Sequence, residues 1–219
     1  MRQPPPEVLK AAAGTPCRDV IDRDLQILFC GINPSLMTAA VGHHFARPGN
    51  RFWKTLAGAH LTPRLLSAAE DEQLVRFGLG ITNLVARATR TAAELSAEEL
   101  VAGWQALQKK IRHYRPRTIA FLGIGAYRIA SGDRGARIGP QESTLAGASV
   151  WALPNPSGLN AHYQLPELIE LYGGIRDANA PAAAVEEEQR SRSESVKTCL
   201  LYTSPSPRDR SLSRMPSSA

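Results

Sequence analysis

The sequence predicts an α/β protein in which helices cover both faces of a mostly parallel sheet. Three short apolar runs, residues 26–31, 118–122 and 149–153, have the length and the bounding turns of buried strands. Stretches with apolar residues at helical spacing lie between them, and strands that alternate with helices favour a parallel sheet. A chain of 219 residues with 43% apolar residues can bury one substantial core. We therefore expect a single folded domain over residues 24–178.

The two ends of the chain carry little pattern. Residues 1–23 contain three consecutive prolines and an alanine run, and are expected to form a poorly ordered arm with a short helix near residues 8–13. Residues 179–219 are rich in Ala, Glu, Ser and Arg, which predicts a disordered tail. Within that tail, CLLYTSPSPRD corresponds to one reading frame of a common sequencing adaptor, so residues 197–219 are interpreted as a read-through artefact.

In the first half of the domain, the strand at residues 26–31 leads into a loop and then a helix. This helix is expected to begin near Asn50, a good N-cap, and to end at Gly58. A second helix is expected over residues 62–77, and a short extended segment over residues 81–85.

In the second half, Ser96 and Glu99 form a capping box that begins a helix. Trp104 lies on the apolar face of this helix, which is more typical of a core residue than of a base-stacking one. The strand at 118–122 runs into a Gly-x-Gly that lacks the third glycine of a dinucleotide site. The apolar repeat of the helix that starts at Ser96 continues until Pro116. A loop with an edge strand is expected over residues 132–147, and a strand over residues 149–153. The last helix is expected over residues 166–172, ended by Gly173 and Gly174.

Composition excludes several classes of protein. No run approaches the roughly 18 apolar residues of a membrane span, and the N-terminus lacks the apolar core of a signal peptide. We therefore expect a soluble cytoplasmic protein. Its three cysteines, Cys17, Cys30 and Cys199, are too few and too scattered for a disulfide framework or a metal cluster. His43 and His44 have no further ligands at a suitable spacing, so no metal and no cofactor is expected.

The net charge of +6 is weak evidence for a nucleic-acid partner. Residues from Lys197 onward carry four basic side chains and one acid, which leaves a charge of +3 for the rest of the chain. A charge of this size does not by itself indicate a polyanionic ligand. A role with nucleic acid must therefore rest on a local site.

Two rigid polar loops follow two of the predicted strands. In GINPS, Pro34 biases Asn33 away from the helical region, so the asparagine side chain projects from the strand end. The second loop is PNPSGLN, residues 154–160. Because the carboxyl ends of parallel strands lie at one edge of the sheet, the two loops should converge. Taken alone, Asn33 and Asn83 are each typical of ordinary turns.

Three motifs occur in the order expected for a known family: GINPSLMTAAVGHHFARPGNRFW, GITNLV and LPNPSGLN. Between residues 25 and 176 the chain resembles the mismatch-specific uracil/thymine DNA glycosylases of the uracil-DNA glycosylase superfamily. The resemblance implies a three-layer α/β/α domain that extrudes a damaged base from duplex DNA and cuts its N-glycosidic bond, in base excision repair. It implies double-stranded DNA as the partner, and we expect a monomer.

The resemblance also assigns the residues of the first loop. Asn33 matches the catalytic asparagine, which orients a water but accepts its proton poorly, so the chemistry should be slower than with an aspartate. Phe45 matches the aromatic residue that stacks on the flipped base. Asn83 falls where some members bind the pyrimidine edge. The walls of the base pocket are assigned to Ile32, Thr38 and His44, with a phosphate contact as the alternative for His44.

In the second loop, Leu159 matches the apolar wedge that fills the gap left by the flipped nucleotide. Gly158 and Asn160 are expected to present backbone groups to the unpaired guanine, and Ser157 to bind phosphate beside Asn155. Because unpairing costs least at a mismatch, G·U pairs should be preferred to A·U pairs.

Two positions depart from well-known members. Ser35 stands in place of glycine and is expected to narrow the approach to the base. Thr38 is expected to lie near C5 of the pyrimidine and to crowd a thymine methyl group. A different class of function also fits these residues: a DNA- or nucleotide-binding module that keeps the fold but has lost catalysis.

Overall fold

The computed structural model describes residues 3–179. The adaptor-like segment and the predicted tail fall on residues outside this range, except for Asn179, which ends the last helix. Within residues 3–179, no helix is long and apolar enough to cross a membrane.

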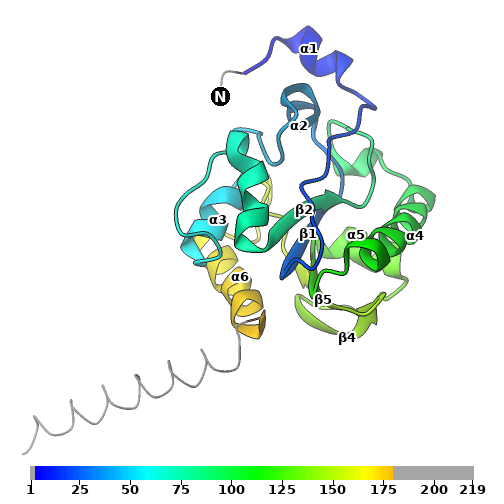
Figure 1. Cartoon of the computed structure of the whole chain (residues 1–219). Helices are drawn as coiled ribbons and strands as arrows, with labels where there is room; N and C mark the ends of the chain where they lie inside the picture. Colours follow the sequence, from blue (N-terminus) through cyan, green and yellow to red (C-terminus); the bar gives the residue numbers. More distant parts are fainter. Residues whose placement is uncertain (1–2, 180–219) are drawn as a thin grey trace, which may run out of the picture. The chain divides into compact units, whose positions relative to one another are not determined.

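A five-stranded sheet organises the domain (Figure 1). Its order is β2 (Leu79–Asn83), β1 (Ile27–Gly31), β3 (Thr118–Leu122), β5 (Ala148–Leu153) and β4 (Gly139–Leu145). The first four strands are parallel, and β4 pairs antiparallel with β5 at the edge. The predicted mostly parallel sheet is confirmed, including the edge strand within residues 132–147.

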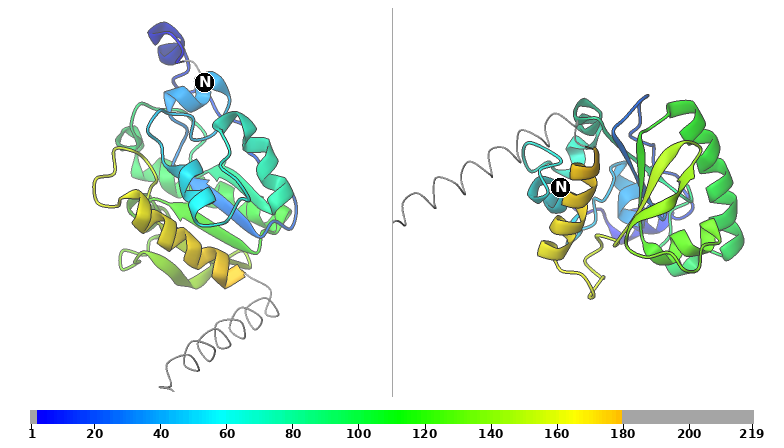
Figure 2. Two further views of the ribbon diagram at one scale, coloured as in Figure 1. Left: turned by 90° about the vertical axis from the view of Figure 1, so that its left-hand side faces the viewer. Right: turned by 90° about the horizontal axis from the view of Figure 1, so that it is seen from below.

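Helices cover both faces of the sheet, as Figure 2 shows when the domain is seen from below. Alternate residues of β1 point to opposite faces, because side chains alternate along a strand. Phe29 packs with α3 (Phe52–Gly58) and α6 (Leu165–Asn179), while Leu28 packs with α4 (Ala97–Tyr114) and α5 (Ile124–Ser131). The expected three-layer α/β/α arrangement is therefore present.

Local signals predicted several helix boundaries correctly. α3 begins at Phe52, close to the expected start, although its N-cap is Arg51 and not Asn50. Asn50 lies one residue earlier, where its Oδ1 accepts a hydrogen bond from the Phe52 N–H at 2.9 Å. Ser96 Oγ accepts from the Glu99 N–H at 3.2 Å, and Glu99 Oε2 accepts from the Ser96 N–H at 2.9 Å, which completes the predicted capping box of α4. Trp104 stacks on Phe121 and packs against the core, as expected.

In the first half, one predicted helix needs correction and one further helix was not predicted. The helix expected over residues 62–77 is a 3₁₀ helix, η1, that covers only Ala68–Phe77. The preceding stretch contains Pro63 and leaves Leu65 exposed, so the apolar spacing did not mark one helix face. A short helix that we did not expect, α2 (Leu36–Val41), follows the Asn33 loop and is capped by Ser35.

The last helix continues through Gly173 and Gly174 instead of ending there. Each glycine costs a helix roughly 1 kcal/mol relative to alanine. Tyr172 and Ile175, which flank the pair, are fully buried against the sheet. Burial of two such side chains contributes more than the glycines cost, at about 1.5–3 kcal/mol each, so α6 extends to Asn179.

The N-terminal segment is not the poorly ordered arm that we expected. After α1 (Pro6–Ala11), the chain lies along β2, where Val20 and Ile81 exchange backbone hydrogen bonds of 2.9 and 2.7 Å. Asp19 accepts a 2.8 Å hydrogen bond from Thr82 and pairs with Lys110 of α4. The segment thus covers the otherwise open edge of β2, whose backbone groups need partners.

Candidate active site

A cleft lies at the carboxyl ends of β1, β2, β3 and β5, beside the point where the strand order reverses between β1 and β3. Ligands of open α/β sheets bind at this place, because loops diverge there. Its volume is about 180 Å³, smaller than the roughly 300–1,000 Å³ of pockets for drug-sized molecules. The cleft therefore suits a single planar ring better than a dinucleotide.

Nine of the eleven predicted site residues line this cleft; they are Ile32, Asn33, Thr38, His44, Phe45, Asn83, Asn155, Ser157 and Leu159. Asn33 and Leu159 thus face the same cavity, although 126 positions separate them in the chain. Gly158 and Asn160 are not part of the lining. Side chains that we did not predict also line it, namely Arg47, Asn50, Thr89 and Arg90.

The amide of Asn33 is held in one orientation. Its Nδ2 donates to the Arg87 carbonyl oxygen at 3.0 Å and to Thr89 Oγ1 at 2.7 Å. A carbonyl only accepts, and the Thr89 hydroxyl donates its own hydrogen to the Thr91 carbonyl oxygen at 2.7 Å. Neither of these contacts uses Oδ1, so the Asn33 oxygen is the atom free to accept a hydrogen bond from a water in the cleft.

The segment that orients Asn33 is itself braced from α4. The Arg87 guanidinium binds Glu99 through two hydrogen bonds of 2.5 and 2.9 Å. This contact lowers the pKa of Glu99 to about 2, so the carboxylate stays ionised. The sequence alone does not indicate Arg87 and Thr89, because they lie more than 50 positions from Asn33 in a stretch without periodicity.

Asn83 presents an unsatisfied donor at the floor of the cleft. Its Nδ2 is buried and makes no hydrogen bond within the part of the chain that the structure describes. A Cβ atom on Gly31 would lie 2.7 Å from Asn83 Oδ1, so only glycine leaves room for this amide at the end of β1. A buried donor without a partner is costly, unless a ligand supplies an acceptor.

Phe45 is held in the cleft by the core beneath it. Its ring stacks on Phe52 of α3 with a centroid distance of 4.0 Å. The Phe45 backbone has a φ of 52°, an unfavourable conformation for a bulky residue that persists only where its surroundings impose it. Phe45 is therefore half-buried against the core and also lines the cleft.

Ser35 and Thr38 are linked through the first turn of α2. Ser35 Oγ accepts a 3.1 Å hydrogen bond from the Thr38 N–H and donates to the Thr38 hydroxyl. Both residues line the cleft, and Thr38 is 4% exposed. A serine at position 35 is thus explained by its capping of the helix that presents Thr38.

Arg51 ties the second loop to the first, a role that the sequence alone does not indicate. Its guanidinium donates to the carbonyl oxygens of Tyr163, Ser157 and Asn160 at 2.5, 2.6 and 3.0 Å. Gly158 packs against the loop that contains Gly49, where a Cβ would lie 2.6 Å from the Gly49 oxygen. These contacts join the two loops into one wall of the cleft.

Within the second loop, Leu159 is 70% exposed and lines the cleft. Asn160 differs from its predicted role, because its backbone N–H already donates to the Ser157 carbonyl oxygen at 3.0 Å and its carbonyl oxygen accepts from Arg51. Its side chain donates to the Asn155 carbonyl oxygen at 3.0 Å. Asn160 therefore stabilises the loop, and its N–H is not free to meet a guanine.

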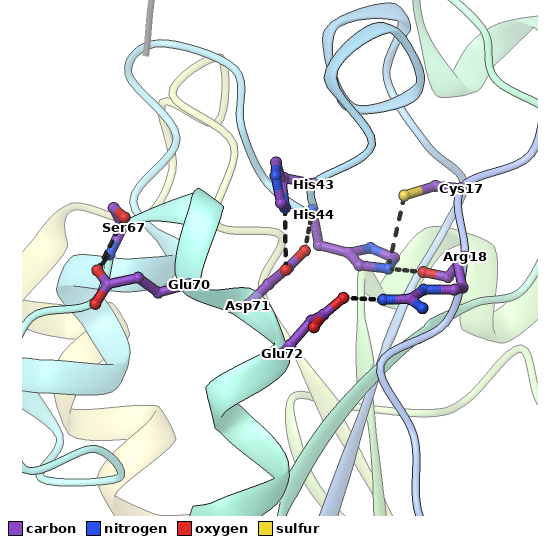
Figure 3. A network of polar contacts seen from close by, with 8 residues as sticks. All are labelled: Cys17, Arg18, His43, His44, Ser67, Glu70, Asp71 and Glu72. Carbon is purple, nitrogen blue, oxygen red and sulfur yellow. Dashed lines mark hydrogen bonds and ion pairs between the residues drawn. The ribbon is translucent and has the colours of Figure 1, made fainter.

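His44 belongs to a polar network behind the cleft (Figure 3). Its Nε2 lies 2.7 Å from the Arg18 carbonyl oxygen, which only accepts, so Nε2 carries the hydrogen. Its backbone N–H donates to Asp71 at 2.9 Å, and the other oxygen of Asp71 lies 3.1 Å from His43. Burial lowers the pKa of His44, which makes it a neutral wall residue.

Cys17 Sγ lies 3.8 Å from His44 Nε2, but the two residues do not form a nucleophilic pair. Burial, assisted by Asp71, raises the pKa of the Cys17 thiol to about 11. A protonated thiol is a poor nucleophile, and the nearest histidine nitrogen already carries a hydrogen. Over residues 3–179, no three His, Cys, Asp or Glu side chains converge to hold a metal ion.

Burial of His44 predicts that stability falls in mild acid. Because its pKa is lower in the folded chain than the roughly 6.5 of an unfolded one, the unfolded chain binds a proton first as the pH drops. As the pH falls from about 6.5 to 5, the free energy of unfolding should decrease by up to about 1.4 kcal/mol per pH unit, so the protein should be less stable at pH 5 than at pH 7. Urea unfolding at both pH values measures this difference. We expect a smaller fall in His44→Gln, and the wild-type fall in His113→Gln on the exposed end of α4.

Comparison with known proteins agrees with this geometry. The family model of the uracil DNA glycosylase superfamily matches residues 18–172, which include every residue of the cleft. The fold is similar to the solution NMR structure of a candidate uracil DNA glycosylase from Methanosarcina acetivorans, with a TM-score of 0.54 and 18% sequence identity. That match covers 76% of this chain and 99% of the other. The chain belongs to the uracil DNA glycosylase superfamily.

Proposed function

We propose that the protein is a monofunctional DNA glycosylase that removes uracil from G·U mismatches in duplex DNA. The observation that carries this proposal is that Asn33, Asn83 and Leu159 line one cleft of single-base size. They supply an acceptor for water, a donor for the base and an apolar wedge, the three groups that extrusion and hydrolysis of a nucleotide require.

In the proposed reaction, the flipped uracil stacks on Phe45, and its O4 accepts a hydrogen bond from the unsatisfied Asn83 Nδ2. A cytosine would present an amino donor at that place, which leaves two donors opposed. Of these two bases, only uracil offers an acceptor to the buried Asn83 Nδ2. This supports a preference for uracil over the normal base.

The bond between C1′ of the sugar and N1 of uracil breaks first, and its electron pair leaves with the base. Asn33 Oδ1 orients a water whose oxygen then bonds to C1′, while the proton passes to solvent. Because a neutral amide does not accept that proton, the enzyme forgoes general-base catalysis worth about 10² to 10⁴ in rate. We therefore expect slow chemistry that depends on the position of the water.

An alkali-cleavage assay on a uracil-containing duplex tests the proposal. Strand breaks at the uracil with the wild-type protein, and their loss in Asn33→Ala, would support a glycosylase whose chemistry resides in this cleft. Binding of the duplex without strand breaks would instead identify a binding module that shares the fold. Cleavage of A·U duplexes as fast as G·U duplexes would contradict the mismatch preference.

The size of Thr38 leads to a prediction about thymine. Thr38 is buried in the cleft wall, where we place C5 of the pyrimidine. Thr38→Ala should raise the rate on G·T relative to G·U by about tenfold or more, since one carbon group in a tight pocket discriminates by roughly 10- to 200-fold. Single-turnover rates on matched G·T and G·U duplexes give the ratio. Comparable wild-type rates on both duplexes would show that Thr38 does not exclude the thymine methyl group.

A further inference from the structure

A second cavity lies beside the base cleft, between α1 and α2, which pack together at one end of the domain (Figure 1). Ser35, Arg47 and Arg90 line both cavities and form the wall between them. The rest of the second cavity is mainly apolar and includes Leu36 and Met37. The base cleft thus adjoins a mainly apolar cavity, and two guanidinium groups and a hydroxyl lie between the two.

The two arginines are available for a ligand. Both are exposed, and neither side chain makes a hydrogen bond or an ion pair with another residue in the range 3–179. Arg51 and Arg87, which come from the same two loops, are by contrast committed to backbone oxygens and to Glu99. A guanidinium without a carboxylate partner, at the edge of a cavity, is suited to bind a phosphate through two parallel hydrogen bonds.

The charge around both cavities agrees with an anionic ligand. No aspartate or glutamate of the described residues lines either one. A base that occupies the cleft brings a phosphodiester to its edge, because each nucleotide is joined to the next through one phosphate. The wall between the cavities is therefore the place where that phosphate would meet Arg47 and Arg90.

We propose that the second cavity is a subsite for the nucleotide next to the flipped one, on the same strand. Arg47 and Arg90 bind the phosphodiester between the two nucleotides, and the mainly apolar cavity takes the neighbouring sugar and base. This inference rests on the proposed function, since it places a base in the cleft. The subsite contacts one strand only, so it contributes to binding of single-stranded DNA as well as duplex DNA.

Binding of short single strands tests the subsite without any need for catalysis. Fluorescence anisotropy is measured with an oligonucleotide that contains one uracil. Two further oligonucleotides carry an uncharged methylphosphonate on the 5′ or the 3′ side of that uracil. The proteins are the wild type, the double variant Arg47→Ala/Arg90→Ala, and the control Arg112→Ala, which removes an exposed arginine near the end of α4.

For the wild type, one of the two methylphosphonates should weaken binding about tenfold, which corresponds to loss of one charge-assisted contact. The double variant should bind the unmodified strand about tenfold more weakly than the wild type does. The methylphosphonate that weakens wild-type binding should reduce the affinity of the double variant only slightly further. The slope of log affinity against log salt concentration should also be shallower by about 0.7, the value for one phosphate on a single strand. Arg112→Ala should bind as the wild type does.

Three results would overturn the subsite: an equal methylphosphonate effect in the wild type and the double variant, an equal loss of binding in Arg112→Ala, or no single-strand binding by the wild type. Failure of the proposed function would look different. In that case the single strands would still bind, and binding would still weaken in Arg47→Ala/Arg90→Ala, but the protein would release no uracil from single-stranded or duplex DNA.

Discussion

Asn33→Ala is expected to lower the single-turnover rate of uracil release from a G·U duplex by roughly 10²- to 10³-fold. The substitution removes Oδ1, the only atom of the Asn33 amide that its contacts with Arg87 and Thr89 leave free. Affinity for an uncleaved duplex should remain close to that of the wild type, because in the proposed reaction Asn33 binds the water and not the DNA backbone. Rates with protein in excess over DNA separate the chemical step from product release.

Thr89 supplies a matched pair of controls for the Asn33 prediction. Thr89→Ser keeps the hydroxyl that accepts from Asn33 Nδ2, whereas Thr89→Val removes it and leaves the amide less firmly oriented. We expect near wild-type rates for the serine variant and a loss of about fivefold for the valine variant, because one hydrogen bond is worth about 1 kcal/mol. A wild-type rate in Asn33→Ala would exclude this asparagine from the mechanism.

Leu159→Ala should lower the rate on a G·U duplex by about 10- to 100-fold while the rate on single-stranded DNA changes little. The proposed wedge would offset part of the few kcal/mol that unpairing and unstacking cost, and a single strand has no such cost to offset. Because Leu159 is 70% exposed, the substitution removes little buried surface, and the thermal midpoint should not change. Single-turnover rates on both substrates measure the contrast.

Leu65→Ala is the matched control for the wedge prediction. Leu65 is also an exposed leucine in a loop, at 55%, but it lies outside the lining of the cleft. Its substitution should leave both rates unchanged. If Leu159→Ala slows the duplex and the single strand equally, the leucine acts within the cleft and not as a wedge.

Signals that lie close together in the chain predicted much of the fold. The strand expected at residues 118–122 is β3 without any shift, and the capping box at Ser96 begins α4. Both patterns depend on neighbouring residues. The strand is an apolar run that is buried as a whole, and the capping box supplies acceptors to the free N–H groups of the helix. The position of Asn33 and Leu159 at one cleft also followed from the sequence, because parallel strands bring their carboxyl ends to one edge.

Contacts between distant segments decided the remainder. Burial of Tyr172 and Ile175 carries α6 past two glycines, and the open edge of β2 orders the N-terminal segment around Val20. No pattern of neighbouring residues in the sequence predicts the packing of Tyr172 and Ile175 or the pairing of Val20 with β2.

The sequence by itself determined the α/β class, the parallel sheet and the two loops that meet over the cleft. Only the tertiary structure decided which atom of Asn33 is free, that Arg51 braces the loop of residues 154–160, and that Arg47 and Arg90 have no partner among residues 3–179. The physical reason is range. Propensity, capping and alternation act over a few neighbouring residues, whereas the hydrogen bond that orients the Asn33 amide joins residues more than 50 positions apart.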